Sequence, residues 1–418
     1  MNALALSAPI DFFVGLAALL FAQSIAALRD GYRFLGYVRR SLIKPPSDFT
    51  PRVAVIIPCK GVDPDFELNL TRFMAQDYPR YQLILVVASE NDPAHRTIET
   101  LLEKAKSSQA QVPQLAAKAE LVVAGYSEVR GEKVNNLLRG LAAVDRSVEV
   151  IVCADADARP HDDWLRSLVA PLEDPRVTVS TGFRWYLPGP GFVSQLRAAW
   201  DTSIATLLGE QRSNFAWGGS MAMRADDFNR LEIAGRYWAH TVSDDYAVYR
   251  AVRDAGGWIR FEPRCLVASR EDSTFREFLK WSNRQIILTR VYASRLWKLG
   301  LAAQGLYCST FLLGLALLAS SRTHLSARIG IAAVLLAMLG LGLAKGHIRT
   351  IVAREAFPEE RVALARYAAR YWQLSPLVPW VMLFNFLAAG LTRRIEWRGT
   401  WYDLRSAKEV RVIRRGAS

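Results

Sequence analysis

Long apolar stretches occupy residues 10–28, 301–320 and 329–344 of the chain. Each lacks charged residues except at its margins and is long enough, or nearly so, to cross a bilayer as a helix. A fourth apolar stretch, 374–391, is interrupted by two prolines and an asparagine. The pattern predicts a membrane-anchored protein in which 374–391 re-enters the membrane or lies at its interface.

Between the first two stretches the apolar positions follow strand and helix patterns in turn. Short β-branched runs predict strands, and apolar stripes at helical spacing predict helices, at 53–57, 65–76, 83–88, 94–107, 121–124, 133–143 and 148–154. Strands that alternate with helices form βαβ units, hence a largely parallel sheet. The region is therefore predicted to be an α/β nucleotide-binding domain, although it has neither a GxGxxG nor a P-loop motif.

The whole chain is predicted to divide into six segments. They are an N-terminal transmembrane helix (1–30), a linker (31–50), a globular α/β domain (51–275), an interfacial helix (276–300), transmembrane or re-entrant helices (301–392) and a basic tail (393–418). The interfacial helix is expected because apolar and basic residues share an amphipathic stretch close to a membrane segment.

Basic residues are concentrated at the membrane flanks and in the tail, and the net charge is +13. Arg29, Arg33 and Arg40 follow the first apolar stretch, and no basic segment precedes it. The positive-inside rule then predicts an outer N-terminus and a cytoplasmic globular domain and tail. Anionic lipid explains the charge better than nucleic acid, for which no binding motif is present. The four cysteines form no paired motif, as expected for reduced thiols.

Two aspartates one residue apart close the last predicted strand. Asp155 and Asp157 follow the apolar run 148–154, and side chains two residues apart on a strand point the same way. The carboxyl edge of an open α/β sheet is where such folds bind ligands. Two oxygen ligands there suit Mg²⁺ or Mn²⁺ carrying a diphosphate, and an acidic turn without metal is the alternative.

Six short segments resemble the ordered motifs of one enzyme family. They are Pro58-Cys59-Lys60-Gly61, Asn91-Asp92-Pro93-Ala94, Lys133-Val134-Asn135-Asn136-Leu137, Asp155, Asp244-Asp245-Tyr246 and Trp397-Arg398-Gly399. Together they resemble the processive and lipid-directed family 2 glycosyltransferases, and most closely the ceramide glucosyltransferase branch, family 21. The resemblance implies that 51–275 is a GT-A-type, Rossmann-like α/β catalytic domain.

The resemblance assigns roles to the aspartates. The family's base-contacting aspartate falls on Asp92, and its metal-linked aspartate falls on Asp155, with Asp157 completing a D-x-D pair. The catalytic base, which takes the proton of the acceptor hydroxyl, falls on Asp245. Local roles stay open beside these, because Asp92 suits an Asx turn and the pair Asp244-Asp245 suits a helix N-terminus.

Two further positions resemble ligand-binding parts of the family. Lys60 is a candidate for binding nucleotide or phosphate, and a solvated basic side chain is the alternative. The glycine-rich run 217–220 resembles the acceptor-side loop. Gly219 would let the backbone approach a ligand closely, although an ordinary tight turn would also use glycines.

The family's last motif, Q/R-x-x-R-W, corresponds to residues 277–281, where Glu277 and Lys280 depart from it. Trp281 is expected to line the acceptor site, and Lys280 to face the diphosphate as a point charge. The residues at 284–285, one turn later, are an alternative source of these contacts, and a core or interfacial role is the alternative for Trp281.

The resemblance implies an inverting, metal-dependent transfer of glucose from UDP-glucose to a membrane lipid. Membrane segments on both sides of the domain suit such an acceptor, because a lipid hydroxyl reaches Asp245 without leaving the bilayer. Ceramide is the implied acceptor, and diacylglycerol and hopanoid lipids are alternatives. A polysaccharide synthase and a catalytically silent scaffold or sugar-nucleotide sensor are the competing classes. The expected location is a bacterial inner membrane.

Overall fold

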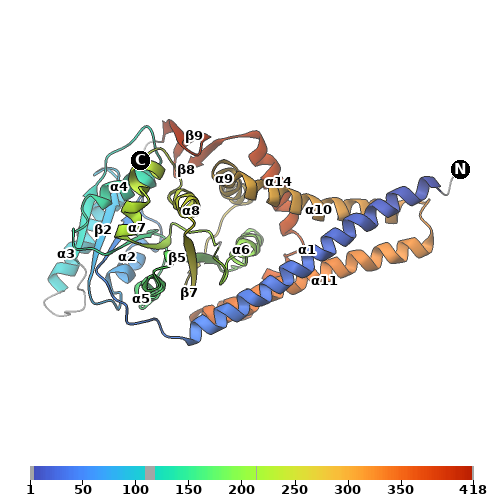
Figure 1. The fold of residues 1–418 in the computed structure, drawn as a ribbon, viewed down its shortest axis with the longest axis horizontal. Coiled ribbons are helices and arrows are strands. Elements are labelled where there is room, and N and C mark those ends of the chain that lie inside the picture. Colours follow the sequence, from blue (N-terminus) through green and yellow to red (C-terminus); the bar gives the residue numbers. More distant parts are fainter. Residues whose placement is uncertain (1–3, 109–117, 213, 417–418) are drawn as a thin grey trace. The chain divides into compact units, whose positions relative to one another are not determined.

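The structure, a computed structural model, describes residues 4–108, 118–212 and 214–416 (Figure 1). The chain forms two compact units. The α/β unit consists of Val38–Trp185, Leu208–Ser269 and Arg393–Ser418, and the helical unit consists of Met1–Tyr37, Tyr186–Leu207 and Arg270–Thr392. Each unit is therefore assembled from stretches that are far apart in the sequence.

A seven-stranded sheet forms the centre of the α/β unit. Its strands are β1 (Val53–Pro58), β2 (Tyr81–Val87), β3 (Lys118–Val123), β4 (Val150–Ala154), β5 (Val177–Tyr186), β6 (Ser220–Arg224) and β7 (Trp258–Ser269). They lie in the order β3-β2-β1-β4-β6-β5-β7. The first four strands run parallel, whereas β6 is antiparallel to both β4 and β5. The predicted α/β fold is confirmed, with an antiparallel second half that the sequence patterns did not reveal.

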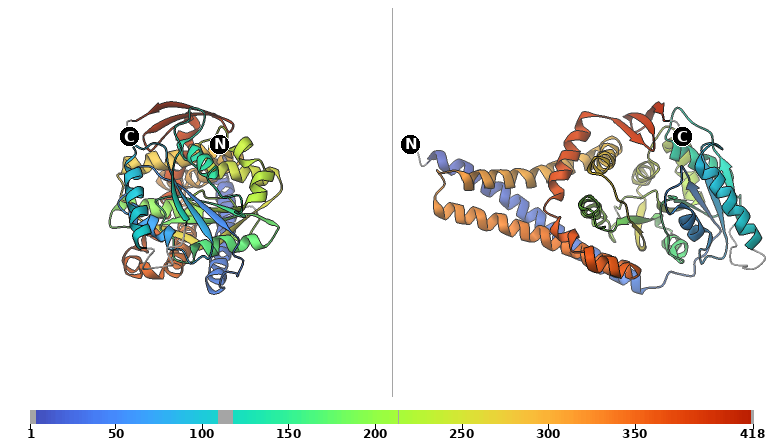
Figure 2. Two further views of the ribbon diagram at one scale, coloured as in Figure 1. Left: turned by 90° about the vertical axis from the view of Figure 1, so that its left-hand side faces the viewer. Right: turned by 180° about the vertical axis from the view of Figure 1, so that it is seen from behind.

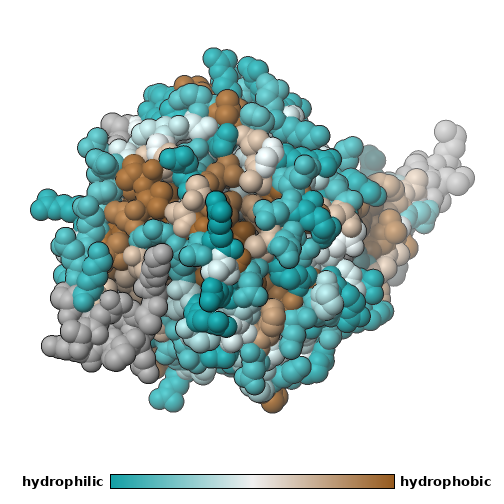
Figure 3. Space-filling model, turned by 60° about the vertical axis from the view of Figure 1, so that its left-hand side comes forward, coloured by the Kyte–Doolittle hydropathy of each residue, from teal (hydrophilic) through white to brown (hydrophobic). Residues whose placement is uncertain are grey.

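Helices cover both faces of this sheet, so that its central strands are buried on both sides. One apolar cluster joins the sheet to α2 (Phe66–Met74), α3 (Pro93–Ser108) and α5 (Trp164–Val169). The other joins it to α4 (Glu132–Leu141), α7 (Ala225–Arg230) and α8 (Asp244–Asp254). Val55 and Ile56, adjacent on β1, belong to different clusters, as the alternation along a strand requires. Hydrophilic side chains predominate on the face shown in Figure 3.

The predicted basic tail is folded into a small antiparallel sheet that belongs to the α/β unit (Figure 2). Its strands are β8 (Arg394–Trp397), β9 (Thr400–Ser406) and β10 (Glu409–Arg415). Apolar side chains such as Ile395 and Leu404 are buried, whereas the adjacent Arg394 and Arg405 are exposed. The high density of basic residues masked this strand alternation in the sequence.

The helical unit contains α1 (Leu4–Ile43, up to Tyr37), α6 (Phe192–Ala205), α9 (Phe275–Tyr292), α10 (Ser294–Ala319), α11 (Leu325–Ala356), α12 (Arg361–Tyr367), α13 (Arg370–Gln373) and α14 (Val378–Leu391). Apolar side chains of α1, α10 and α11 pack together in one cluster. Among the described residues these three helices are long and apolar enough to cross a membrane, and α14 is a shorter apolar helix. The predicted combination of an α/β domain with membrane helices is therefore confirmed.

Two predicted boundaries differ from the structure. The first helix does not end at residue 30, because α1 continues to Ile43 through most of the predicted linker. The helix expected at 276–300 is interrupted at Ala293, whose φ of −139° and ψ of 57° are not helical, so that α9 ends at Tyr292 and α10 begins at Ser294. The break at Ala293 was not visible in the apolar pattern, because alanine itself favours helix.

Candidate active site

Lys133, near the start of α4, is the cation around which two acidic segments meet. Its Nζ lies 2.7 Å from Oδ1 of Asp155, just after β4, and 3.2 Å from Oδ1 of Asp244, at the start of α8. It also donates to the carbonyl of Gly218 at 3.3 Å. Burial would lower the pKa of Lys133, but the facing carboxylates, Asp155 foremost, outweigh burial and raise the pKa. Lys133 is therefore charged and ties the two segments together.

The D-x-D pair is held by Arg184 of β5. The guanidinium donates to both oxygens of Asp157, with Nη1 at 3.0 Å from Oδ2, and its Nη2 lies 3.4 Å from Oδ2 of Asp155. It also lies 5.3 Å from the centre of the Trp217 ring. Burial would raise the pKa of Asp157, but the pairing with Arg184 holds that pKa well below its usual range. Both carboxylates thus contact one cation.

The same two aspartates fit a divalent cation by the chemistry of their oxygens. Mg²⁺ commonly takes one or two carboxylates from the protein and completes its shell with phosphate and water. Among the described residues, no group of three or more His, Cys, Asp or Glu side chains could hold a metal ion. Oδ2 of Asp244, however, is buried without a hydrogen-bond partner in the described chain. The donor set therefore fits a cation that arrives with a diphosphate, provided that Arg184 releases Asp157.

The two aspartates at the start of α8 lie in different environments. Ser243 is the N-cap, and its Oγ accepts from the N–H of Tyr246 at 3.4 Å. Asp244 is buried, and burial raises its pKa to about 6 against the pull of the nearby lysine. Asp245 is half-buried, and its Oδ1 accepts from the N–H of Tyr246 at 2.7 Å and from the Ser243 hydroxyl. The capping role expected for the aspartates falls instead on Ser243.

Gly218 and Gly219 let the loop before β6 pass between the acidic side chains. A Cβ on Gly218 would lie 2.0 Å from Oδ2 of Asp244. A Cβ on Gly219 would lie 2.2 Å from the Trp217 ring and 2.6 Å from Oδ2 of Asp155. The Gly218 N–H in turn points to Oδ2 of Asp245 at 3.4 Å. The close backbone approach predicted for Gly219 is thus an approach to the chain's own acidic groups.

Asp92 and Lys60 lie on the loops that follow β2 and β1. Asp92 is buried, and its Oδ1 accepts from the N–H groups of Gly61 at 2.8 Å and Ala94 at 2.9 Å. The Asx turn that the sequence suggested as a local role for Asp92 is therefore present. Lys60 pairs with Glu132, the first residue of α4, at 2.8 Å. Both residues lie at the carboxyl ends of parallel strands, the same edge of the sheet as the D-x-D pair.

The α/β unit thus brings together six of the predicted residues, namely Lys60, Asp92, Asp155, Asp157, Gly219 and Asp245. Trp281 and Lys280 lie on α9 in the helical unit. The Trp281 ring meets Tyr186 and Trp200 edge-on, with centroids 5.6 and 5.1 Å apart, and Lys280 is exposed. Trp281 is therefore part of an aromatic cluster, as its alternative role required.

The departure of Glu277 from the family motif has a local explanation. Thr274 and Glu277 form a capping box at the start of α9, in which each side chain accepts from the other residue's backbone N–H. The Glu277 carboxylate bonds the Thr274 N–H at 2.8 Å. Glu277 is therefore the third residue of α9, and its carboxylate serves to cap the N-terminus of that helix.

Sequence reasoning did not assign a role to three cations that hold this region together, namely Lys133, Arg184 and Arg398. Lys133 and Arg398 stood within segments that resemble family motifs, and that was the signal available for them. Arg184 carried no such signal, because it lies on an apolar strand and meets Asp157 only through the antiparallel half of the sheet.

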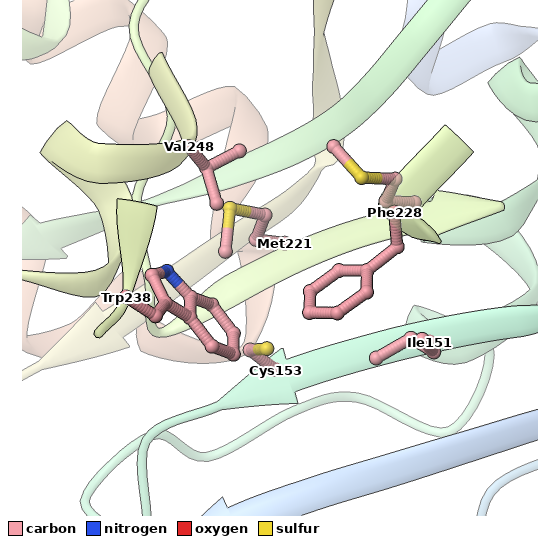
Figure 4. Close-up of a pocket in the computed structure, with 7 residues that line it drawn as sticks. Ile151, Cys153, Met221, Phe228, Trp238 and Val248 are labelled. Carbon is pink, nitrogen blue, oxygen red and sulfur yellow. The ribbon is translucent and has the colours of Figure 1, made fainter. Parts of the chain in front are cut away.

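A small cavity near α8 is lined by the apolar side chains of Ile151, Cys153, Met221, Met223, Phe228, Trp238 and Val248 (Figure 4). The indole N–H of Trp238 donates to the carbonyl of Asp244 at 3.1 Å. No acidic or basic side chain lines the cavity, which therefore belongs to the packing beneath α8 and offers nothing to bind a charged ligand.

Comparison with known proteins identifies the family. The model of glycosyl transferase family 21 matches residues 19–410. A ceramide glucosyltransferase of Komagataella phaffii is 33% identical over 141 residues, which are 31% of this chain and 25% of that protein. The aligned part thus spans about a quarter of that relative.

Two solved structures match parts of this chain at low identity. A mannosyltransferase from Pyrobaculum calidifontis, PcManGT, matches 91% of this chain and 98% of its own with 18% identity and a TM-score of 0.48. Glucosyl-3-phosphoglycerate synthase from Mycobacterium tuberculosis matches 61% of this chain and 83% of its own with 16% identity and a TM-score of 0.35. Neither structure assigns an activity to this chain, because the sequence identities and the TM-scores are low. From the match over most of its length, this chain belongs to glycosyltransferase family 21.

Proposed function

We propose that this protein transfers a sugar from a UDP-sugar to the hydroxyl of a membrane lipid, with glucose as the sugar and ceramide as the acceptor. Family membership supports glycosyl transfer, and the partial match to a ceramide glucosyltransferase supports the glucose donor and the sphingoid acceptor. The three apolar helices support an acceptor that stays in the bilayer. The proposed location is the cytoplasmic face of a bacterial inner membrane.

The observation that carries the proposal is the convergence of acidic groups at one edge of the sheet. Asp155 and Asp244 share Lys133. Asp245 accepts from the N–H of Gly218, whose carbonyl accepts from the same lysine. The Asp92 loop reaches the same region through the Gly61 N–H. A nucleotide base at Asp92 and a diphosphate near Asp155 would place the sugar toward the half-buried Asp245.

Asp245 is the proposed base in a single in-line displacement. Its carboxylate takes the proton of the acceptor hydroxyl as that oxygen bonds to the anomeric carbon. The bond between this carbon and the diphosphate oxygen breaks in the same step, so that UDP leaves with the electron pair and the configuration inverts. The Ser243 hydroxyl and the Tyr246 N–H fix the carboxylate through Oδ1. Oδ2, whose contact with the Gly218 N–H is long at 3.4 Å, is the oxygen proposed to receive the proton.

Asp155 and Asp157 are the proposed holders of a divalent cation. Such a cation, when bound, neutralises the charge that develops on the departing diphosphate. Arg184 must release Asp157 before a cation can bind there, since its guanidinium now donates to both oxygens of that carboxylate. Lys133 keeps Asp155 in place throughout, because its Nζ bonds the other oxygen of that carboxylate. Lys280 and Trp281 remain proposed contacts of the diphosphate and the acceptor.

The test is lipid labelling by membranes that contain the protein. Radiolabelled UDP-glucose, UDP-galactose and UDP-N-acetylglucosamine are each supplied with ceramide, diacylglycerol or a hopanoid lipid. Asp245→Asn should lower lipid labelling by about 10²- to 10⁴-fold, the usual contribution of a general base. Asp254→Asn, at the exposed end of the same helix, is the matched control and should leave labelling unchanged.

Each contrary result identifies a different error. Labelling that survives Asp245→Asn removes Asp245 as the base, and labelling of another lipid corrects the acceptor. A polymeric product would indicate a polysaccharide synthase. The absence of product with every donor, together with retained UDP-sugar binding, would indicate a sensor or scaffold. Removal of divalent cations by EDTA should abolish labelling, and Mg²⁺ or Mn²⁺ should restore it.

A further inference from the structure

The turn between β8 and β9 presents an arginine in an unusual backbone conformation. Arg398 and Gly399 have φ angles of 43° and 79°, so both central residues are left-handed, as in a type I′ turn. Glycine or asparagine adopts this conformation at little cost, whereas arginine rarely does. An arginine retained where the backbone disfavours it points to a use for its side chain.

The guanidinium of Arg398 contacts two of the loops that build the proposed nucleotide-sugar site. Its Nη1 donates to the carbonyl of Lys60 at 2.7 Å, and its Nη2 donates to Asp63 at 2.8 Å. The same Nη2 lies 3.9 Å from Oδ2 of Asp157. Arg398 therefore stands between the loop that bonds Asp92 through Gly61 and the D-x-D pair.

Neighbouring residues hold the small sheet on the same loops. Thr400, which follows the turn, places its Oγ1 3.4 Å from Nζ of Lys60. The hydroxyl of Tyr402 on β9 accepts from the N–H of Glu132 at 3.2 Å. The C-terminal sheet thus contacts the loop after β1 and the start of α4, at the carboxyl edge of the large sheet.

Arg398 is also the most accessible of the cations near the D-x-D pair. Its side chain is 41% exposed, whereas those of Arg184 and Lys133 are 13% and 17% exposed. A ligand that enters this edge can reach Arg398 without first displacing buried groups. Its present partner Asp63 is itself 44% exposed, so exchanging that contact for a ligand would leave no buried charge unpaired.

We propose that the C-terminal sheet is a working part of the nucleotide-sugar site, and that Arg398 binds the diphosphate. The inference rests on the proposed function and deepens it. A diphosphate that joins a base near Asp92 to a cation at Asp155 and Asp157 must pass the region that Arg398 spans. A guanidinium offers a planar fork of N–H donors that matches two phosphate oxygens, which a lysine does not.

The test compares UDP with uridine, since these ligands differ only in the diphosphate. Binding of each to the purified full-length protein is measured by calorimetry at a fixed Mg²⁺ concentration. Arg398→Ala should weaken UDP binding roughly 10- to 100-fold, the effect of losing a hydrogen bond to a charged group, and should leave uridine binding unchanged. Arg398→Lys should show an intermediate loss, because a point charge replaces the fork.

Arg405→Ala is the matched control, because Arg405 lies on β9 and contacts Asp403 and Glu409 of its own sheet. It should bind both ligands as the wild type does. UDP affinity unchanged in Arg398→Ala, or equal losses for UDP and uridine in both Arg398 variants, would overturn the role of Arg398 in binding the diphosphate. Failure of the wild type to bind UDP would instead overturn the proposed function. If Arg398→Ala does not fold, Arg398→Lys alone decides between these outcomes.

Discussion

Lys133 is a residue of the α/β unit whose loss we expect to be costly. Its ammonium is the shared partner of Asp155 and Asp244, and both its side chain and that of Asp244 are largely removed from water. Removing one partner of a buried ionic network leaves uncompensated charge, at a cost on the order of 3–5 kcal/mol. Lys133→Met should therefore lower the free energy of unfolding by about that amount, measured by thermal unfolding of the purified protein.

A second substitution separates this electrostatic cost from a loss of packing. Asp244→Asn removes one of the two carboxylates that Lys133 neutralises, so the double variant Lys133→Met, Asp244→Asn should be more stable than Lys133→Met alone. Lys408→Met, at an exposed turn of the C-terminal sheet, is the control and should unfold like the wild type. Strictly additive losses in the double variant would contradict the ionic role of Lys133.

Gly219 is a second residue with a specific steric requirement. A methyl group there would meet the Trp217 ring at 2.2 Å and Asp155 Oδ2 at 2.6 Å. Overpacking of this kind costs roughly 1–3 kcal/mol, and it would displace the carboxylate proposed to bind the cation. Gly219→Ala should thus reduce lipid labelling more than tenfold, whereas Gly235→Ala, where the added carbon meets nothing within 4 Å, should retain activity. Equal activity of the two variants would refute this steric role.

At the scale of residues, spacing along a strand was informative and pairing across the fold was not. The i, i+2 spacing of Asp155 and Asp157 predicted that both would leave the sheet edge together, and one guanidinium contacts both. The partner itself could not be predicted, since Arg184 is 27 residues from Asp157 and lies on another strand. Local sequence determines the direction of a side chain, whereas the topology determines what it meets.

Among the elements, α9 has the best-defined beginning. Both bonds of the Thr274–Glu277 capping box are present, and they satisfy backbone N–H groups that the helix leaves without intrahelical partners. Thr274→Ala should cost about 1 kcal/mol, read as a lower thermal unfolding temperature, whereas Thr274→Ser keeps the hydroxyl and should cost much less. A Thr274→Ala variant as stable as Thr274→Ser would show that the capping box contributes nothing to stability.

Element types were predictable where the periodicity was clean. The parallel strands and their helices were found because β-branched runs alternate with helical stripes. The strands β8 to β10 were missed because arginines dominate the segment, although the Arg398-Gly399 pair between alternating positions could have indicated a two-residue hairpin. The break at Ala293 could not be predicted, since no helix-breaking residue marks it and tertiary packing overrides the local preference.

For the molecule as a whole, the two units constrain how the chain can cross a membrane. The chain leaves the α/β unit at Ser269 and returns to it at Arg393. A folded unit lies on one side of the membrane, so the number of crossings between these residues must be even. α10 and α11 are long enough to cross, whereas α14 has 14 residues and spans about 21 Å, less than the roughly 30 Å of a hydrocarbon core.

We therefore expect α10 and α11 to cross, α14 to remain at the interface, and the C-terminal sheet to share the cytoplasmic side with the large sheet. Single cysteines at Ser321, between α10 and α11, and at Lys408, between β9 and β10, test this with a membrane-impermeant maleimide on intact spheroplasts. The four native cysteines are buried thiols and should react poorly. Ser321→Cys should react before lysis and Lys408→Cys only after it. Reaction of Lys408→Cys in intact spheroplasts would contradict this topology, because it would place the small sheet outside. That placement requires a third crossing, and the small sheet could then not contact the loops of the large one.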